Sequence, residues 1–456
     1  MSKYDVVIVG GGISGLAALH FIKTLHPSKT VRLLEADSRL GGTIGTDFID
    51  GYSFDWGPNG FLDREPLTLK LCHELGLDDT LERAGNNVSK RFIMRGGRLR
   101  EVPMSPLKFM KSDILSIPGR LRLLREPFAS VSKEEDETIY DFVVRRIGRE
   151  AADYLVQPMV SGVYGGLAER LSLKSCFGIM HEMEAEYGSL IKAMIAKSKA
   201  AKKEGKKSGG PAGPGGWLTS FKGGLYPLIE RFAELYSEYI HTNFPVNKIT
   251  RTAEGYIIQS TGSENIQTSK VIIATPSYKA GDMVSELSPA LKKQLSAIPY
   301  APIAVVCLGY DKADVAHPLD GFGFLVPPKE KKNILGSIWT SSIFANRSPK
   351  GEVQFRCMLG GDGNHEIVNK SDDELIELTI IDLNSVVGLK STPKITKVYK
   401  WKKGIPQFIL GHQERLRNIE NELIKLEGIY LAGNAYYGIS LNDCVKQAYK
   451  IVDSMK

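Results

Sequence analysis

Cysteine and histidine are scarce in this chain of 456 residues, and neither falls into a chemical motif. The cysteines are odd in number, scattered and never spaced as CxxC: Cys72, Cys176, Cys307, Cys357 and Cys444. Such usage excludes a disulfide framework and is typical of a reduced, cytosolic protein. The eight histidines show no HxxxH or HExxH spacing, so the sequence predicts no metal site.

Long hydrophobic runs are also missing. A membrane-spanning helix needs about 20 consecutive apolar residues, whereas the longest candidate here, residues 298–310, is interrupted by Pro299 and Pro302. The N-terminus has no signal-peptide layout, because it enters a strand-like pattern by Tyr4. We therefore expect a cytoplasmic protein, with any membrane contact peripheral and on the cytoplasmic face.

A large charge of one sign is absent too. The 59 Lys and Arg exceed the 52 Asp and Glu only slightly, so we expect no nucleic-acid partner. With 42% hydrophobic and 24% charged residues, the composition excludes collagen-like, coiled-coil and disordered chains. Glycine, in contrast, is abundant: its 46 residues fall in short clusters, which indicates backbone that wraps closely around a ligand.

The first glycine cluster has the pattern of a dinucleotide-binding site. A β-branched run over residues 4–9 predicts a buried parallel strand, residues 16–22 predict a helix, and a second strand over 30–34 ends at Glu35. The first turn fits GxGxxG: Gly10, Gly11, Gly12, Ile13, Ser14 and Gly15. In this motif the glycines let a pyrophosphate approach the helix N-terminus, and the acid accepts hydrogen bonds from the ribose hydroxyls.

The residues after Glu35 distinguish FAD from NAD. Arg39-Leu40-Gly41-Gly42-Thr43 resembles the Arg-x-Gly-Gly element of FAD flavoproteins related to amine oxidases and phytoene desaturases. No second GxGxxG follows a strand, so the chain lacks an obvious NAD(P)H module. We expect FAD, reduced by the substrate and reoxidised by an external acceptor. The contacts expected here are Ala36, Arg39, Gly42 and Thr43.

The fold class that these patterns predict is α/β, with a discontinuous, Rossmann-like FAD-binding domain of the amine-oxidase type. A late strand that reaches glycine and a closing helix return the chain to the nucleotide sheet. We expect this domain to comprise residues 1–85, 222–285 and 425–456. We also expect a mostly helical region at 86–221 and an inserted, sheet-containing α+β substrate-binding domain at 286–424.

Two stretches are rich in basic residues. Residues 107–125 mix bulky apolar and basic side chains, which suits either an anionic membrane surface or an amphipathic helix packed on its own core. Residues 192–216 contain seven lysines followed by a Gly/Pro tail, a composition typical of a solvated, mobile loop.

Five separate stretches resemble the FAD-dependent, oxygen-using protoporphyrinogen oxidase family. They are residues 54–61, 161–166, 340–347, 405–412 and 438–444, and the similarity runs in order through almost the whole chain. The segment Ile-Pro-Gln-Phe-Ile-Leu-Gly-His at 405–412 is specific to that family, whereas GxGxxG is shared by many flavoproteins. The resemblance implies heme biosynthesis and oxidation of protoporphyrinogen IX to protoporphyrin IX. Six electrons leave as three hydrides to FAD, which O2 or another acceptor reoxidises, with O2 giving H2O2.

The same resemblance implies where substrate and flavin bind. Arg91 matches an arginine that pairs with a substrate carboxylate, and Gly166 matches a glycine that lines the pocket. Leu325 and Phe344 match apolar walls, which suit a broad apolar disc with propionate arms. The further flavin contacts it implies are Gly57, Pro58, Asn59, Gly60, Val246, Asn434, Ile439, Ser440 and Leu441. No acid–base residue is assigned, since the cofactor carries the chemistry.

Other interpretations stay open. Oxidation of coproporphyrinogen III to coproporphyrin III is the nearest, because the related enzymes share fold, cofactor and motifs. A flavin amine oxidase shares the FAD motifs but does not account for residues 405–412, and a non-catalytic binding protein of this fold would lack the yellow colour of a flavin. The resemblance also implies handover of the product to the next heme-pathway enzyme and leaves a homodimer open.

Overall fold

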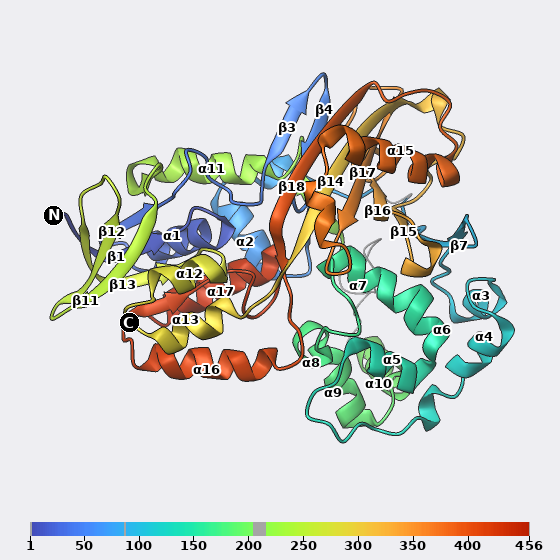
Figure 1. Ribbon diagram of the computed structural model, residues 1–456, viewed down its shortest axis with the longest axis horizontal. Coiled ribbons are helices and arrows are strands. Elements are labelled where there is room, and N and C mark those ends of the chain that lie inside the picture. Colours follow the sequence, from blue (N-terminus) through green and yellow to red (C-terminus); the bar gives the residue numbers. More distant parts are fainter. Residues whose placement is uncertain (1, 86–87, 204–215, 456) are drawn as a thin grey trace.

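A computed structural model describes residues 2–85, 88–203 and 216–455. In these residues two seven-stranded sheets dominate the architecture, and a group of helices lies below the second sheet in the view of Figure 1. Each sheet takes strands from distant parts of the chain, so neither forms from one contiguous segment.

The first sheet contains the GxGxxG motif and is mainly parallel. Its strands lie in the order β10-β2-β1-β13-β12-β11, with β19 paired to β13. Their bounds are β1 Ser2–Val9, β2 Val31–Leu34, β10 Ile240–His241, β11 Val246–Thr252, β12 Gly255–Ser260, β13 Ile266–Ile273 and β19 Ile429–Leu431. Because β1 pairs with strands on both sides and is covered on both faces, its apolar run is unbroken.

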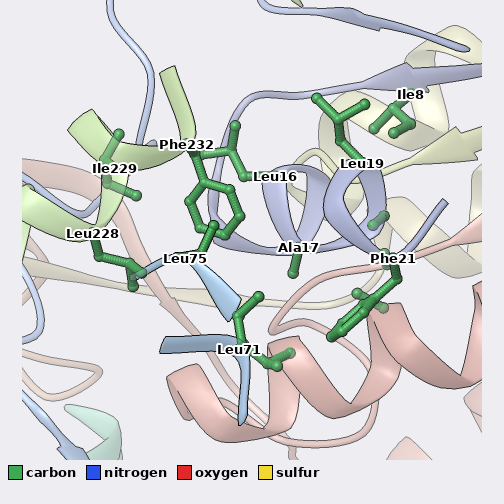
Figure 2. Close-up of a cluster of buried hydrophobic side chains, with 14 of the residues drawn as sticks. Ile8, Leu16, Ala17, Leu19, Phe21, Leu71, Leu75, Leu228, Ile229 and Phe232 are labelled. Atoms are coloured by element: carbon green, nitrogen blue, oxygen red, sulfur yellow. The ribbon is translucent and has the colours of Figure 1, made fainter. Parts of the chain in front are cut away.

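Two hydrophobic clusters cover the faces of this sheet. Val6 and Ile8 face α1, α2, α11 and α17, whereas Val7 and Val9 face α12, α13 and α16. The helices are α1 Ile13–Leu25, α2 Pro66–Glu74, α11 Tyr226–Tyr236, α12 Ser277–Met283, α13 Pro289–Ser296, α16 His412–Ile424 and α17 Leu441–Asp453. Figure 2 shows the first cluster, in which side chains of α1 lie among those of α2 and α11. This packing fixes the N-terminus of α1 at the end of β1.

The second sheet runs in the order β18-β14-β17-β16-β15-β7-β8 and is antiparallel except between β15 and β7. Its strands are β7 Phe92–Arg95, β8 Arg98–Glu101, β14 Tyr300–Asp311, β15 Gly323–Leu325, β16 Ile334–Trp339, β17 Glu352–Gly360 and β18 Ile395–Pro406. The β7–β8 hairpin thus joins this sheet, although it lies in the region expected to be mostly helical. The predicted domain boundaries stay a prediction.

The two faces of the second sheet have different partners. Val353 and Phe355 of β17 pack in the cluster that contains α15 (Asp372–Val387). The opposite face is covered by the hairpin of β3 (Thr46–Ile49) and β4 (Tyr52–Asp55), which comes from the N-terminal part of the chain. The hairpin therefore connects the two sheets physically.

The helices between β8 and β9 (Leu218–Phe221) include one that the sequence analysis missed. Their bounds include α3 Pro106–Lys111, α4 Ile117–Leu123, α5 Ile139–Ile147, α7 Gln157–Tyr164, α9 Gly178–Tyr187 and α10 Leu190–Lys203. The predicted loop is wrong for residues 192–203, which are helical, and residues 204–215 lie outside the described residues. Alanine and lysine favour a helix, and the Glu126 carboxylate caps it by accepting hydrogen bonds from the N–H groups of Leu190 (2.8 Å) and Ile191 (3.2 Å). None of the helices described here is long and apolar enough to cross a membrane.

Candidate active site

The turn between β1 and α1 forms an open cradle. Gly10 has a φ of 111°, which strains a side chain, and a Cβ on Gly15 would collide with the carbonyl oxygen of Gly10. Gly12, in contrast, faces open space, because a Cβ there would meet no heavy atom of the described residues within 4 Å. The first turn of α1 has no capping side chain and no acidic residue. Its N–H groups are therefore available to an anionic ligand.

The carboxylate of Glu35 lies at one end of this cradle. Its Oε2 accepts a hydrogen bond from the N–H of Gly11 (2.6 Å), and its Oε1 accepts one from the N–H of Asp37 (2.9 Å). A carboxylate has about four acceptor sites, so capacity remains for ribose hydroxyls. Ala36 follows at the same end of β2, and Val246 begins β11 with its side chain buried in the second core cluster.

The Arg-x-Gly-Gly turn lies beside the cradle. The N–H of Gly41 donates to the carbonyl of Gly11 (2.8 Å), and Gly42 lies against Gly12. The guanidinium of Arg39 donates to three carbonyl oxygens of its own turn, at 2.5–2.8 Å. In the described residues Arg39 therefore shapes the loop that borders the cradle.

Residues 57–60 continue the same surface. Gly57 packs against the exposed Thr43, whose carbonyl oxygen a Cβ would meet. The Nδ2 atom of Asn59 and the Oγ1 atom of Thr275 are buried and have no hydrogen-bond partner among the described residues. Buried polar atoms nearly always have partners, so these two suit a polar ligand. The open cradle, the uncapped helix and these orphaned atoms all fit FAD.

The C-terminal turn is partly committed to its own helix. The Oγ of Ser440 accepts from the N–H of Asp443 (3.2 Å), and the Asp443 carboxylate accepts from the N–H of Ser440 (3.1 Å). Leu441 and Ile439 pack into hydrophobic clusters, and Asn434 is partly buried in the turn after β19. Helix geometry leaves the first N–H groups of α17 for a ligand.

Arg91 stands immediately before β7, beside an aromatic ring. Its guanidinium lies 5.4 Å from the centre of the Phe322 ring and has no carboxylate partner among the described residues. Burial lowers the pKa of this guanidinium, so a bound anion would stabilise its charged form. Phe322 packs on the cluster that contains the buried Phe344. Phe322 therefore connects Arg91 to this cluster, in which Phe344 is itself fully buried.

Leu325 and Gly166 both lie near the C-terminal end of α7. Leu325, on β15, is so close to Gly162 that a Cβ there would lie 2.7 Å from its Cδ2. Gly166 follows α7 and is buried, and a Cβ on it would lie 2.6 Å from Oε1 of Gln407. A side chain at position 166 would therefore disturb the packing of α7 on the 405–412 segment.

The 405–412 segment joins the helical region to the C-terminal turn. Gln407 donates through Nε2 to the carbonyl of Tyr164 (2.7 Å), at the end of α7. His412 stacks on Phe408, and its Nε2 donates to the carbonyl of Tyr436 (3.0 Å). Burial lowers the pKa of His412 to about 4, so its ring is neutral. This segment acts as a scaffold and supplies no titrating catalytic group near neutral pH.

The sequence analysis did not predict the buried ion pair between Asp55 and Arg347, which lies next to residues 57–60. The carboxylate of Asp55 accepts hydrogen bonds from Thr46 Oγ1 (2.7 Å), Leu225 N (3.1 Å) and Arg347 Nη1 (3.1 Å). Arg347 is fully buried and also donates to the Oγ of Ser220 (2.7 Å). Asp55 and Arg347 both lie in the stretches that resemble the oxidase family, but no spacing rule relates residues so distant in the chain.

The matched family defines the class of the protein. Residues 13–455 match the family described as flavin-containing amine oxidoreductase, and the chain belongs to that family. This membership confirms the amine-oxidase-like fold and a flavin oxidoreductase, and the dinucleotide-binding motif identifies the cofactor as FAD.

The relatives similar in sequence include enzymes named for the oxidation of porphyrinogens. The chain is 34% identical to the chloroplastic protoporphyrinogen oxidase of Oryza sativa subsp. japonica over 98% of its length and 87% of that protein. It is 29% identical to the coproporphyrinogen III oxidase of Bacillus subtilis (strain 168), covering 98% and 96%. A crystal structure from Exiguobacterium sp. 255-15, provisionally described as a protoporphyrinogen oxidase, has a TM-score of 0.85 at 26% identity, covering 100% and 98%.

Proposed function

We propose that the chain oxidises protoporphyrinogen IX to protoporphyrin IX. The observation that carries this proposal is the guanidinium of Arg91, which lies beside the Phe322 ring without an acidic partner in the described part of the chain, whose relatives are named for porphyrinogen oxidation. A guanidinium pairs with a carboxylate through two parallel hydrogen bonds. The partly buried Phe322 beside Arg91 offers an apolar ring to a macrocycle, and Phe344 belongs to the buried cluster on which Phe322 packs.

The proposed division of labour leaves little chemistry to side chains. FAD, when bound, supplies the hydride acceptor. The open cradle at Gly12 and the uncapped start of α1 hold its diphosphate, and Glu35 orients its ribose. Arg91 orients the substrate by a propionate, beside the apolar ring of Phe322. Each desaturation removes one hydride and one proton, so three desaturations transfer six electrons to three O2 and yield three H2O2.

Coproporphyrinogen III oxidation is the second candidate. The match to the Bacillus subtilis relative extends over 96% of that protein, against 87% for the Oryza sativa relative. One observation favours protoporphyrinogen IX over this second candidate. Of the four proposed substrate residues, Arg91 alone carries a charge, and protoporphyrinogen IX has fewer carboxylates to pair than coproporphyrinogen III.

A parallel assay distinguishes the two substrates. Purified protein is given protoporphyrinogen IX or coproporphyrinogen III in air, and porphyrin fluorescence and H2O2 are followed. We expect faster turnover of protoporphyrinogen IX with three H2O2 per porphyrin. A preference for coproporphyrinogen III would select the second candidate, and turnover of neither by a flavin-loaded protein would reject both.

Peripheral membrane contact from the cytoplasm is the second part of the proposal. It is supported by α3 and α4, neither of which contains a buried residue. Leu107 is 79% exposed and Phe128, just beyond α4, is 87% exposed. Lys108 and Lys111 lie beside Leu107 on α3. Exposed apolar side chains next to lysines suit an anionic lipid surface. The homodimer and the handover to a later enzyme stay predictions.

Vesicle binding tests this surface. Changing both Leu107 and Phe128 to Asp is expected to weaken binding to anionic phospholipid vesicles at least tenfold, since each apolar side chain contributes about 1.5 kcal/mol or more. Binding of the unchanged protein is expected to fall as salt rises. Ile424→Asp, at a position on α16 that is also 79% exposed, is the control and should bind normally. Cosedimentation measures all three, and failure of the unchanged protein to bind at low salt would reject the contact.

A further inference from the structure

The β4 strand and the loop after it are held by side chains of the second sheet. Gln354 Nε2 donates to the carbonyl of Ser53 (2.9 Å), and Trp401 Nε1 donates to that of Trp56 (3.3 Å). Arg356 donates twice, through Nε to the carbonyl of Asp55 (3.3 Å) and through Nη2 to that of Gly57. Hydrogen-bond donors of the second sheet thus hold the backbone that leads into residues 57–60, the loop proposed to contact the flavin.

Arg356 differs from the other donors because it is charged. It is only 5% exposed and no ion pair joins it to an acid in the described residues. The adjacent Asp55 carboxylate is already bound by Arg347. A buried charge without a counter-charge is unfavourable, and here two carbonyl dipoles offset only part of the penalty. The charge of Arg356 is therefore not compensated by an acid of the described residues.

A continuous path of contacts leads from the diphosphate cradle to Arg356. Gly12 lies against Gly42, Thr43 follows and packs on Gly57, and the carbonyl of Gly57 accepts the Arg356 hydrogen bond. Glu35, the proposed ribose ligand, accepts a hydrogen bond from the N–H of Gly11, next to Gly12. A dinucleotide with its ribose at Glu35 and its diphosphate at Gly12 would extend its flavin end along this path of contacts toward Gly57.

We propose that Arg356 is a positioning residue that holds the Asp55–Gly57 loop and raises the reduction potential of the bound flavin by its positive charge. Reduction adds electron density to a flavin, and a nearby cation stabilises that form. The inference rests on the proposed FAD site. Arg356, on β17 of the second sheet, would thus tune the reduction potential of the bound cofactor.

Potentiometry of the FAD-loaded protein separates charge from loop position. Arg356→Met is expected to change the equilibrium between oxidised and reduced flavin about tenfold toward the oxidised form, which is about 30 mV for a two-electron couple. Arg356→Lys keeps the charge and should stay within twofold of the unchanged protein. Gln354→Met is the matched control: it removes a hydrogen bond to the same segment, from the same face of β17, without a change of charge. It should also stay within twofold.

Two outcomes would overturn the inference. The first is an unchanged potential in Arg356→Met, and the second is an equal shift in Arg356→Met and Gln354→Met, which would assign the effect to loop position. If Arg356→Met does not fold, Arg356→Gln, which keeps a donor but no charge, should show the same tenfold change. A colourless unchanged protein would instead reject the FAD site itself, so the two failures are distinguishable.

Discussion

Gly12→Asp is expected to give a folded, colourless protein whose affinity for FAD is at least a hundredfold lower. Gly12 has ordinary backbone angles, φ −75° and ψ 177°, and a side chain there meets no neighbour in the described residues. The new carboxylate would occupy the open cradle and repel the diphosphate. Two like charges about 4 Å apart at a protein surface repel by about 4 kcal/mol, and 1.4 kcal/mol corresponds to tenfold in affinity.

The control for this variant is Gly178→Asp. Gly178 is the first residue of α9, as Gly12 directly precedes α1, and a Cβ there also meets nothing within 4 Å among the described residues. Flavin absorbance per protein and a titration of the apoprotein with FAD measure the effect, and circular dichroism checks the fold. Full flavin content in Gly12→Asp would place the cofactor elsewhere.

Arg91→Ala is expected to raise the KM for the porphyrinogen about 30-fold and to leave kcat nearly unchanged. A hydrogen-bonded contact to a charged group contributes about 1.5–3 kcal/mol, and a contact remote from the reacting carbons acts equally on ground and transition states. Arg91→Lys should recover only part of the loss, because an ammonium does not pair in the bidentate manner of a guanidinium.

The neighbouring Lys90 is the matched control for Arg91. It carries the same charge but is exposed and already paired with Asp320. Lys90→Ala should therefore keep KM within twofold. Initial rates from porphyrin fluorescence give both constants, and an unchanged KM in Arg91→Ala would remove its role as the propionate anchor.

The sequence predicts correctly those features that depend only on residues close together in the chain. The GxGxxG turn and Glu35 lie within one strand–helix–strand unit, and the hydrogen bond between Gly11 and Glu35 (2.6 Å) forms inside that unit. The prediction for residues 192–203 was wrong because lysine counts indicate solvation but not conformation. The helix there depends on a cap from Glu126, more than 60 residues away in the chain.

By itself, the sequence determined the class of protein: a dinucleotide motif, an FAD-type turn after it and family-like stretches along the whole chain, since each is encoded within a few neighbouring residues. Only the tertiary structure decided which side chains surround Asp55 and the loop that follows it. Asp55 meets Arg347 and Arg356 because a hairpin from one sheet packs on the face of another. From the sequence alone, an arginine that alternates with apolar residues in β17 is predicted to face solvent. The packing of the hairpin on this face of the sheet is what buries Arg356.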